Sequence, residues 1–280
     1  MQKIESVPDM RLRAAHLKQA GKTVALVPTM GALHAGHAAL IGMAKASAEV
    51  VVVSVFVNPL AFGPSENFAG YPRSPDADSK LCEELKVDVL FAPSAEEMFP
   101  RGHSTTVNED TVSRALCGPS RPTHFRGVTT AVTKLLNVVR PDAMVMGQKD
   151  AQRVAVVRKM VADLHLGVEV VVVPTVRESD GLVVDVRNRD LTATQRQEAL
   201  SIYVALQRAR EMVAQGVRST DRVIAEATHI LGERRRVRVI YVSMVDPLTM
   251  ETVREIVPGR TLLAIAVWVD EIRLIDNILL

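Results

Sequence analysis

Apolar runs of strand length alternate with segments of helical periodicity over the first two thirds of the chain. The continuous apolar runs predict buried β-strands, at residues 23–27, 50–57, 87–92, 143–146 and 168–173. The segments between them predict amphipathic helices, over residues 36–47, 74–85, 125–139 and 150–164. Buried strands joined by helices are typical of a parallel sheet with helices on both faces, so we predict an α/β fold.

The pattern changes after the last of these strands, where a turn at residues 179–181 introduces a second region. Thr192 and Gln195 have the spacing of a capping box and predict the start of a long helix. The other predicted elements are a helix at 219–231 and strands at 238–242, 261–269 and 272–275. We therefore predict two domains, residues 1–175 and residues 176–280, of which the second is a smaller α+β unit.

Composition narrows the class of protein. The 280 residues are 48% hydrophobic and 24% charged, as in an ordinary globular protein, and 34 basic against 32 acidic residues leave a net charge of +2. This balance argues against a dedicated nucleic-acid or membrane-surface protein. Two cysteines make neither a disulfide framework nor a four-thiolate zinc site. The N-terminus does not resemble a signal peptide and no apolar run reaches membrane-spanning length, so we expect a cytoplasmic protein.

The segment 27–37 (VPTMGALHAGH) follows the first predicted strand and leads into the first predicted helix. In a parallel sheet, ligands bind beyond the carboxyl ends of the strands. A helix N-terminus attracts anions, and His34 and His37 can donate hydrogen bonds to phosphate oxygens there. Gly31 and Gly36 allow a ligand to approach the backbone closely. The segment therefore predicts a phosphate site.

Neither of the two common phosphate motifs, G-x-G-x-x-G and G-x-x-x-x-G-K-[ST], is present in this segment. Two histidines without a third ligand nearby do not predict a metal site. The residue types leave one simple alternative open, which is a capped helix that carries two surface histidines.

The string PTMGALHAGH at 28–37 resembles the H-x-G-H signature of the class I aminoacyl-tRNA synthetase and nucleotidyltransferase superfamily, and in particular the pantothenate synthetase family. Further motifs similar to those of this family follow in the same order along nearly the whole chain. They are SVFVNP at 54–59, YPR at 71–73, FAPS at 91–94, SRPTHFRGV at 120–128, GQKD at 147–150, PTVRE at 174–178, DGL at 180–182, AVW at 266–268 and RLIDN at 273–277. Several separated motifs in one order are far more specific than any single motif.

The resemblance implies a Rossmann-like nucleotidyltransferase domain followed by a smaller C-terminal α+β lid domain. It implies an ATP-dependent ligase that adenylates pantoate and then forms an amide with β-alanine, releasing AMP and pyrophosphate. Magnesium and a homodimer are implied as well, whereas no nucleic-acid or membrane partner is expected. Closure of the second domain would bring Arg187 over the phosphates and exclude water from the adenylate.

The resemblance also assigns roles to residues of this chain. The implied catalytic residues are His34, His37, Lys149 and Arg187. Those implied to bind ATP in addition are Met30, Gly31, Gly147, Asp150, Val176, Asp185 and Val186. Those implied to bind the acid substrate are Pro28, Thr29, Met30, Asn58, Ala61, Gln152 and Arg153. Taken one at a time, Lys149, Asp150 and Arg187 are equally compatible with solvated surface charges.

Four departures from the family pattern fall within this implied site. Ala61 and Arg153 stand where the family has the two glutamines that hold pantoate, and Gln148 stands where it has a glutamate. The fourth departure is the pair Asp185 and Val186, which replaces the two serines of the family's phosphate-binding S-S-R-N. An ionised Asp185 cannot donate to a phosphate and would repel it unless a metal ion lies between them.

These departures leave three hypotheses open. The first is an ordinary ligase of pantoate and β-alanine. The second is a paralogous ligase with a larger or more anionic acid, because Arg153 suits a carboxylate or phosphate and Ala61 opens space. The third is a ligand-binding protein with weakened catalysis. The superfamily signature alone would also permit an adenylyltransferase, which the family-wide motifs disfavour.

Overall fold

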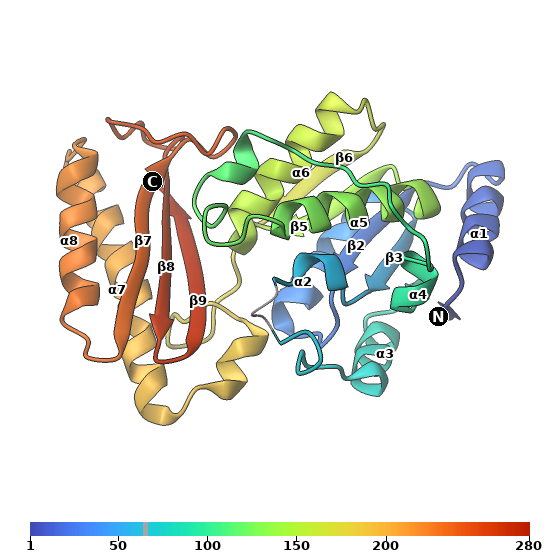
Figure 1. The fold of residues 1–280 in the computed structure, drawn as a ribbon, viewed down its shortest axis with the longest axis horizontal. Coiled ribbons are helices and arrows are strands. Elements are labelled where there is room, and N and C mark those ends of the chain that lie inside the picture. Colours follow the sequence, from blue (N-terminus) through green and yellow to red (C-terminus); the bar gives the residue numbers. More distant parts are fainter. Residues whose placement is uncertain (64–66) are drawn as a thin grey trace. The chain divides into compact units, whose positions relative to one another are not determined.

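The computed structural model describes residues 1–63 and 67–280. Contacts within the chain divide it into two compact units, which are Met1–Gly147 with Val156–Val173 and Gln148–Ala155 with Pro174–Leu280. Helix α6 (Ala151–Asp163) therefore contributes residues to both units. Figure 1 shows the order of the elements along the chain. In the part of the chain that is described, no helix is both long and apolar enough to cross a bilayer.

The first unit is built on a six-stranded sheet in which all neighbouring strands are parallel. Its strands are β1 (Gln2–Ile4), β4 (Val89–Phe91), β3 (Val50–Val55), β2 (Val24–Thr29), β5 (Ala143–Gly147) and β6 (Glu169–Val173), in that order across the sheet. The predicted parallel sheet is confirmed, and the five apolar runs are five of its strands. Strand β1 is not predicted because its three residues carry neither an apolar run nor a clear alternation.

Helices cover both faces of this sheet. They are α1 (Val7–Gln19), α2 (Ala35–Ser47), α3 (Pro75–Glu84), α4 (Ala95–Met98), α5 (His124–Val139) and the later part of α6, with 3₁₀ turns η1 (Pro59–Ala61) and η2 (Val112–Arg114). Ile41 of α2 and Cys82 of α3 share one apolar cluster with Val27 and Val53. Leu26 points to the opposite face, by the alternation of a strand, and is equally inaccessible to solvent.

The order of the strands reverses between β2 and β5, which are neighbours although β3 and β4 lie between them in the sequence. The register pairs Ala25 with Ala143 and Leu26 with Met144. Thr29 and Gly147 therefore lie level at the carboxyl ends of their strands. Because parallel sheets bind ligands at such a reversal, the residues that follow these two strands are the first candidates for a site.

The second unit contains an antiparallel sheet with two long helices (Figure 1). Its elements are η3 (Gln148–Asp150), η4 (Val186–Asp190), α7 (Ala193–Ala214), α8 (Thr220–Gly232), β7 (Val237–Val245), β8 (Leu262–Val269) and β9 (Ile272–Leu279). The predicted α+β character and the capping box of Thr192 and Gln195 are confirmed. Strand β9 runs further than predicted. The prediction ends too early because the polar residues Asp276 and Asn277 interrupt the apolar pattern, although both are buried.

Candidate active site

The turn after β2 brings the backbone N–H groups of residues 31–33 to one place. Gly31 and Ala32 both have positive φ, at 81° and 49°, and for alanine this conformation is unfavourable. The hydroxyl of Thr29 donates to the carbonyl of Ser54 at 2.8 Å and accepts from the Gly31 N–H at 3.3 Å. These contacts fix the start of the turn.

Asp78 of α3 fixes the rest of the turn. Its two carboxylate oxygens accept hydrogen bonds from the N–H groups of Ala32 at 3.0 Å and Leu33 at 2.7 Å. The side chain is buried, so these bonds are shielded from water. A Cβ atom on Gly31 would lie 3.0 Å from an Asp78 oxygen, which requires a glycine or a displaced carboxylate there.

His34 and His37 form a reciprocal cap at the start of α2. The Nδ1 of His34 accepts from the Gly36 N–H at 3.1 Å, and the Nδ1 of His37 accepts from the His34 N–H at 3.2 Å. A neutral imidazole that accepts at Nδ1 carries its proton on Nε2. The centroids of the two rings lie 4.1 Å apart, and both rings therefore carry an Nε2–H group beside a helix N-terminus.

The loop after β3 is held by Asn58 and by the first turns of α5. Asn58 donates from Nδ2 to the Gly127 carbonyl at 2.9 Å and accepts at Oδ1 from the Leu60 N–H at 3.1 Å. A Cβ atom on Gly127 would lie 2.1 Å from the Leu60 carbonyl oxygen, so only glycine permits this approach. The buried amide of Asn58 thus secures the loop that carries Ala61.

Ala61 is buried at the end of this loop. Its carbonyl accepts from Arg121 Nη2 at 3.2 Å and from His124 Nδ1 at 2.7 Å, which fixes the proton of that ring on Nδ1. A pocket of about 360 Å³ lies beside the loop, lined by Pro59, Leu60, Phe62, Gly63, Thr106, Thr123, Arg126 and Gly127. Apolar side chains, two threonines and one arginine surround this pocket, and none of the predicted acid-binding residues lines it.

In the second unit, five side chains form a series of alternating charge that we call the charge ladder: Arg153, Asp150, Lys149, Asp185 and Arg187. Arg153 Nη2 lies 2.8 Å from Asp150 Oδ2, and Asp150 Oδ1 lies 3.5 Å from Lys149 Nζ. The Lys149 ammonium pairs with Asp185 Oδ2, which lies 3.7 Å from Arg187 Nη1. The sequence predicts all five residues as site residues, and the structure joins them.

The three central members of the ladder keep their charges although each is partly or fully shielded from water. Burial alone would raise the pKa of Asp185, but Lys149 and Arg187 outweigh it and hold that pKa below its ordinary range. Burial also opposes ionisation of Asp150, whose pKa is nevertheless lowered by Lys149 and Arg153. Burial disfavours the Lys149 ammonium, yet Asp150 and Asp185 raise its pKa. Asp185, Asp150 and Lys149 are therefore charged at neutral pH.

Two neighbouring residues of β9 position the ladder. Asn277 donates from Nδ2 to the carbonyls of Gln148 at 3.0 Å and Lys149 at 2.9 Å, while Gln148 Nε2 donates to Asn277 Oδ1 at 3.1 Å. Asp276 accepts from Arg177 at 2.6 and 3.0 Å and from the Asn277 N–H at 2.7 Å. The backbone that carries Lys149 is therefore anchored to the sheet of the second unit.

The remaining predicted residues fall into place around these groups. Val176 accepts at its carbonyl from the Val184 N–H at 3.0 Å, beside Asp185. Pro28 and Met30 flank Thr29 in the turn after β2, Gly147 ends β5, Gln152 is buried in α6, and Val186 begins η4. The predicted residues therefore lie in three groups, namely the turn after β2, the loop after β3, and the charge ladder with its surroundings.

Three residues that support the site carry no predicted role. Asp78 has the pattern of an ordinary acidic residue in the first turn of a helix, which conceals its contact with a distant turn. Asp276 and Asn277 belong to a matched motif, and two polar residues within an apolar strand are the signal that could have indicated a function.

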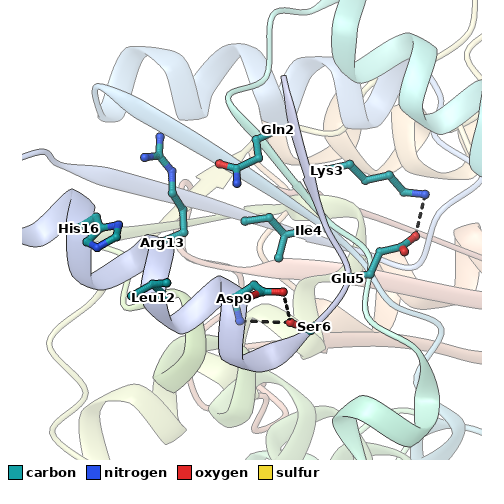
Figure 2. A pocket seen from close by; sticks show the side chains of 9 residues that line it. All are labelled: Gln2, Lys3, Ile4, Glu5, Ser6, Asp9, Leu12, Arg13 and His16. Atoms are coloured by element: carbon teal, nitrogen blue, oxygen red, sulfur yellow. Dashed lines mark hydrogen bonds and ion pairs between the residues drawn. The ribbon is translucent and has the colours of Figure 1, made fainter.

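A larger pocket, of about 540 Å³, lies at β1 and α1 (Figure 2). It is lined by Gln2, Lys3, Ile4, Glu5, Ser6, Asp9, Leu12, Arg13 and His16. Lys3 pairs with Glu5 at 2.7 Å, and Ser6 caps α1 by accepting from the Asp9 N–H at 3.2 Å. No predicted site residue lines this pocket.

Comparison with known proteins gives a consistent result along the whole chain. A sequence model of the family described as pantoate-beta-alanine ligase matches residues 2–279. The pantothenate synthetase of Heliobacterium modesticaldum is 48% identical over 277 residues, which cover 99% of this chain and 98% of that protein. The pantothenate synthetase of Thermotoga petrophila is 45% identical over 280 residues and covers both chains completely.

Solved structures agree with the sequence matches. The crystal structure of pantothenate synthetase from Thermus thermophilus has a TM-score of 0.94 and 41% identity, covering 100% of this chain and 99% of that one. Pantoate-beta-alanine ligase from Francisella tularensis, complexed with beta-gamma ATP and beta-alanine, has a TM-score of 0.82 and 30% identity, covering 100% of this chain and 97% of that one.

Proposed function

Because this chain belongs to the pantoate-β-alanine ligase family, we propose that it adenylates pantoate with ATP and joins the product to β-alanine. Members of this family are ATP-dependent ligases that form an amide bond. The observation that carries the proposal is the orientation of His34 and His37, whose Nδ1 atoms are both occupied by backbone N–H groups. Their Nε2–H groups are the donors that a polyphosphate needs at a helix N-terminus.

The reaction has two steps. A carboxylate oxygen of the acid attacks the α-phosphorus of ATP, the bond to the bridging oxygen breaks, and pyrophosphate leaves with the electron pair. The amine nitrogen then attacks the carbonyl carbon of the acyl adenylate, loses a proton and expels AMP. His34 and His37 would donate to phosphate oxygens, and Lys149 would place a positive charge where negative charge develops.

Magnesium is part of this proposal, and the residues present fit it. Such an ion is held in phosphoryl-transfer sites by one or two carboxylates together with substrate phosphates. Asp150 and Asp185 are ionised carboxylates of the charge ladder and would hold it. When bound, the ion supplies neutralisation of phosphate charge.

The proposal is tested by AMP release from ATP in the presence of magnesium, pantoate and β-alanine. We expect AMP and the amide to form in equal amounts, and AMP release to depend on both organic substrates over many turnovers. Omission of each substrate is the control. Absence of both products from folded, ATP-binding protein would contradict the proposal.

A second candidate, a ligase for a different acid, is favoured by Ala61 and Arg153. Ala61 is small and buried, and the buried Nε of Arg153 has no hydrogen-bond partner among residues 1–63 and 67–280. That nitrogen is a donor for a carboxylate or phosphate. A thermal-shift panel of acids, with ATP present, tests this candidate, which fails if pantoate stabilises the protein most. Binding without turnover of any acid would indicate a non-enzymatic ligand-binding protein.

We also propose, from the family resemblance, a cytoplasmic homodimer. Analytical ultracentrifugation tests the assembly, and a sedimenting mass of about twice 30.6 kDa is expected.

A further inference from the structure

The charge ladder contains three cations and two anions, and therefore carries a net charge of +1. Two of its members, Arg153 and Asp185, have opposite charges, and both are the residues that the family resemblance marks as departures from its pattern. A chain with neutral side chains at both positions would keep two cations and one anion, which is the same net charge. The two departures therefore compensate each other electrostatically.

Asp185 is fixed in place rather than free to swing. Its side chain is only 5% exposed. Its Oδ1 accepts from the Arg187 N–H at 2.9 Å as the N-cap of η4, and its Oδ2 pairs with the Lys149 ammonium. Both oxygens are thus engaged, and the carboxylate contacts Lys149 as a phosphate oxygen of a ligand would.

Arg153 is at the end of the ladder opposite to Arg187, and its partner is Asp150. It lies one turn after Asp150 along the chain and pairs with it at 2.8 Å. Asp150 also lies 3.5 Å from Lys149, so it shares that cation with Asp185. Because Lys149 contacts both carboxylates, Arg153 gives Asp150 a second cation, and this one is not shared with Asp185.

We infer that Arg153 and Asp185 are positioning residues that act as one compensating pair. Asp185 pairs with Lys149 as an internal anion that the ATP phosphates must displace. Arg153 pairs with Asp150, so that Asp150 competes less with the phosphates for Lys149. This inference rests on the proposed function, since it assigns Lys149 to the phosphates of ATP.

The test is calorimetric binding of ATP to wild type, Asp185→Asn, Arg153→Gln and the double variant, in EDTA so that no metal bridges carboxylate and phosphate. We expect Asp185→Asn to tighten binding about tenfold and Arg153→Gln to weaken it about tenfold. The double variant should return to within about threefold of wild type. A purely structural role would weaken binding in both single variants, so the opposite signs are decisive.

Matched controls come from an ion pair of the same unit outside the ladder. Arg208 lies 2.9 Å from Glu226, and Arg208→Gln and Glu226→Gln should leave ATP affinity unchanged. The inference is overturned if Asp185→Asn binds metal-free ATP no more tightly than wild type, or if Arg153→Gln leaves ATP affinity at the wild-type value.

If the wild type binds no ATP with or without magnesium, the proposed function fails separately. The pair is then judged by thermal unfolding of the four ligand-free proteins. We expect the loss of Tm in the double variant to be smaller than the sum of the two single losses by about 2 °C. Additive losses would overturn the inference in that case.

Discussion

The two units hold their candidate chemistry by different means. In the first unit, His34 and His37 are neutral donors whose rings are fixed by backbone N–H groups within a single turn of the chain. In the second unit, Lys149 and Asp185 are opposite charges from separate segments, fixed by pairing with each other. Local backbone bonds orient the two imidazoles, whereas an ion pair between distant segments orients Lys149 and Asp185.

This difference predicts which substitutions should damage each unit most. A neutral ring held by a helix cap depends on the shape of the turn, so steric and capping changes should damage it most. An ion pair with little exposure depends on both partners, because removal of one leaves a buried charge uncompensated. Substitutions of the two kinds therefore separate steric support from electrostatic support.

The largest effect is expected for Lys149→Met. The adenylation rate should fall on the order of 10³-fold, because a cation is lost where phosphate charge develops. The free energy of unfolding should fall by about 3–5 kcal/mol, since Asp185 is left buried without its ammonium partner. Single-turnover AMP formation and urea unfolding measure the two effects.

Lys159→Met is the matched control for this prediction. Lys159 pairs with Asp163 one turn along α6, with both side chains about half exposed. Its loss should cost at most about 0.5 kcal/mol and leave the rate unchanged. Equal effects of the two lysine variants would show that the ladder does not differ from a surface pair.

The next largest effect is expected for His34. Both His34→Asn and His34→Ala remove the Nε2–H donor, so adenylation should fall about 10²-fold in each. Asparagine is a good N-cap and alanine is not, so only His34→Ala should also lose about 1 kcal/mol of stability. Should His34→Asn retain the wild-type rate, the ring serves only as a helix cap.

The sequence predicts the parts of the molecule that local pattern controls. The strands of the parallel sheet are continuous apolar runs, and the turn of His34 is marked by glycines and by a strand before it. Asp78 is different, because its role depends on a turn more than 40 positions earlier that its own neighbours do not reveal. The pattern of residue types around Asp78 therefore does not predict its hydrogen bonds to that turn.

The same limit applies to the charge ladder. Arg153 and Asp185 are departures by the family resemblance, and the resemblance predicts an interaction of each with a ligand. Their partners in the structure are Asp150 and Lys149, and the anchor of the Lys149 backbone is Asn277 of the last strand. Pairing between distant segments is a property of the tertiary structure, and residue identity alone does not specify it.

A smaller effect, on stability, is expected for Gly127→Ala in the first unit. The new Cβ atom would lie 2.1 Å from the Leu60 carbonyl oxygen, so the η1 turn or α5 must shift. We expect a loss of about 2–3 kcal/mol in the free energy of urea unfolding. Gly42→Ala, in the exposed interior of α2 with no atom within 4 Å, should instead gain up to about 1 kcal/mol. A loss at both positions would point to a general intolerance of added methyl groups.

The smallest effect, and the sharpest separation of the two units, is expected in the pH dependence of Asp185→Asn. The lowered pKa of Asp185 gives stability that is present above the unfolded pKa of about 3.9 and lost as pH falls through the folded value. The raised pKa of Lys149 gives stability that is present below about 10.4 and lost as pH rises through the folded value. The pair should therefore contribute most between these two limits.

Asparagine at position 185 keeps the cap on the Arg187 N–H but removes the charge, so wild type should exceed the variant by about 1 kcal/mol at neutral pH. Urea unfolding across the pH range should show that difference shrinking towards both extremes. The difference between wild type and Gly127→Ala should stay flat, because the collision of a methyl group with a carbonyl involves no proton. If the difference between wild type and Asp185→Asn does not change with pH, then the ladder, like the histidine turn, is stabilised by packing and hydrogen bonds rather than by charge.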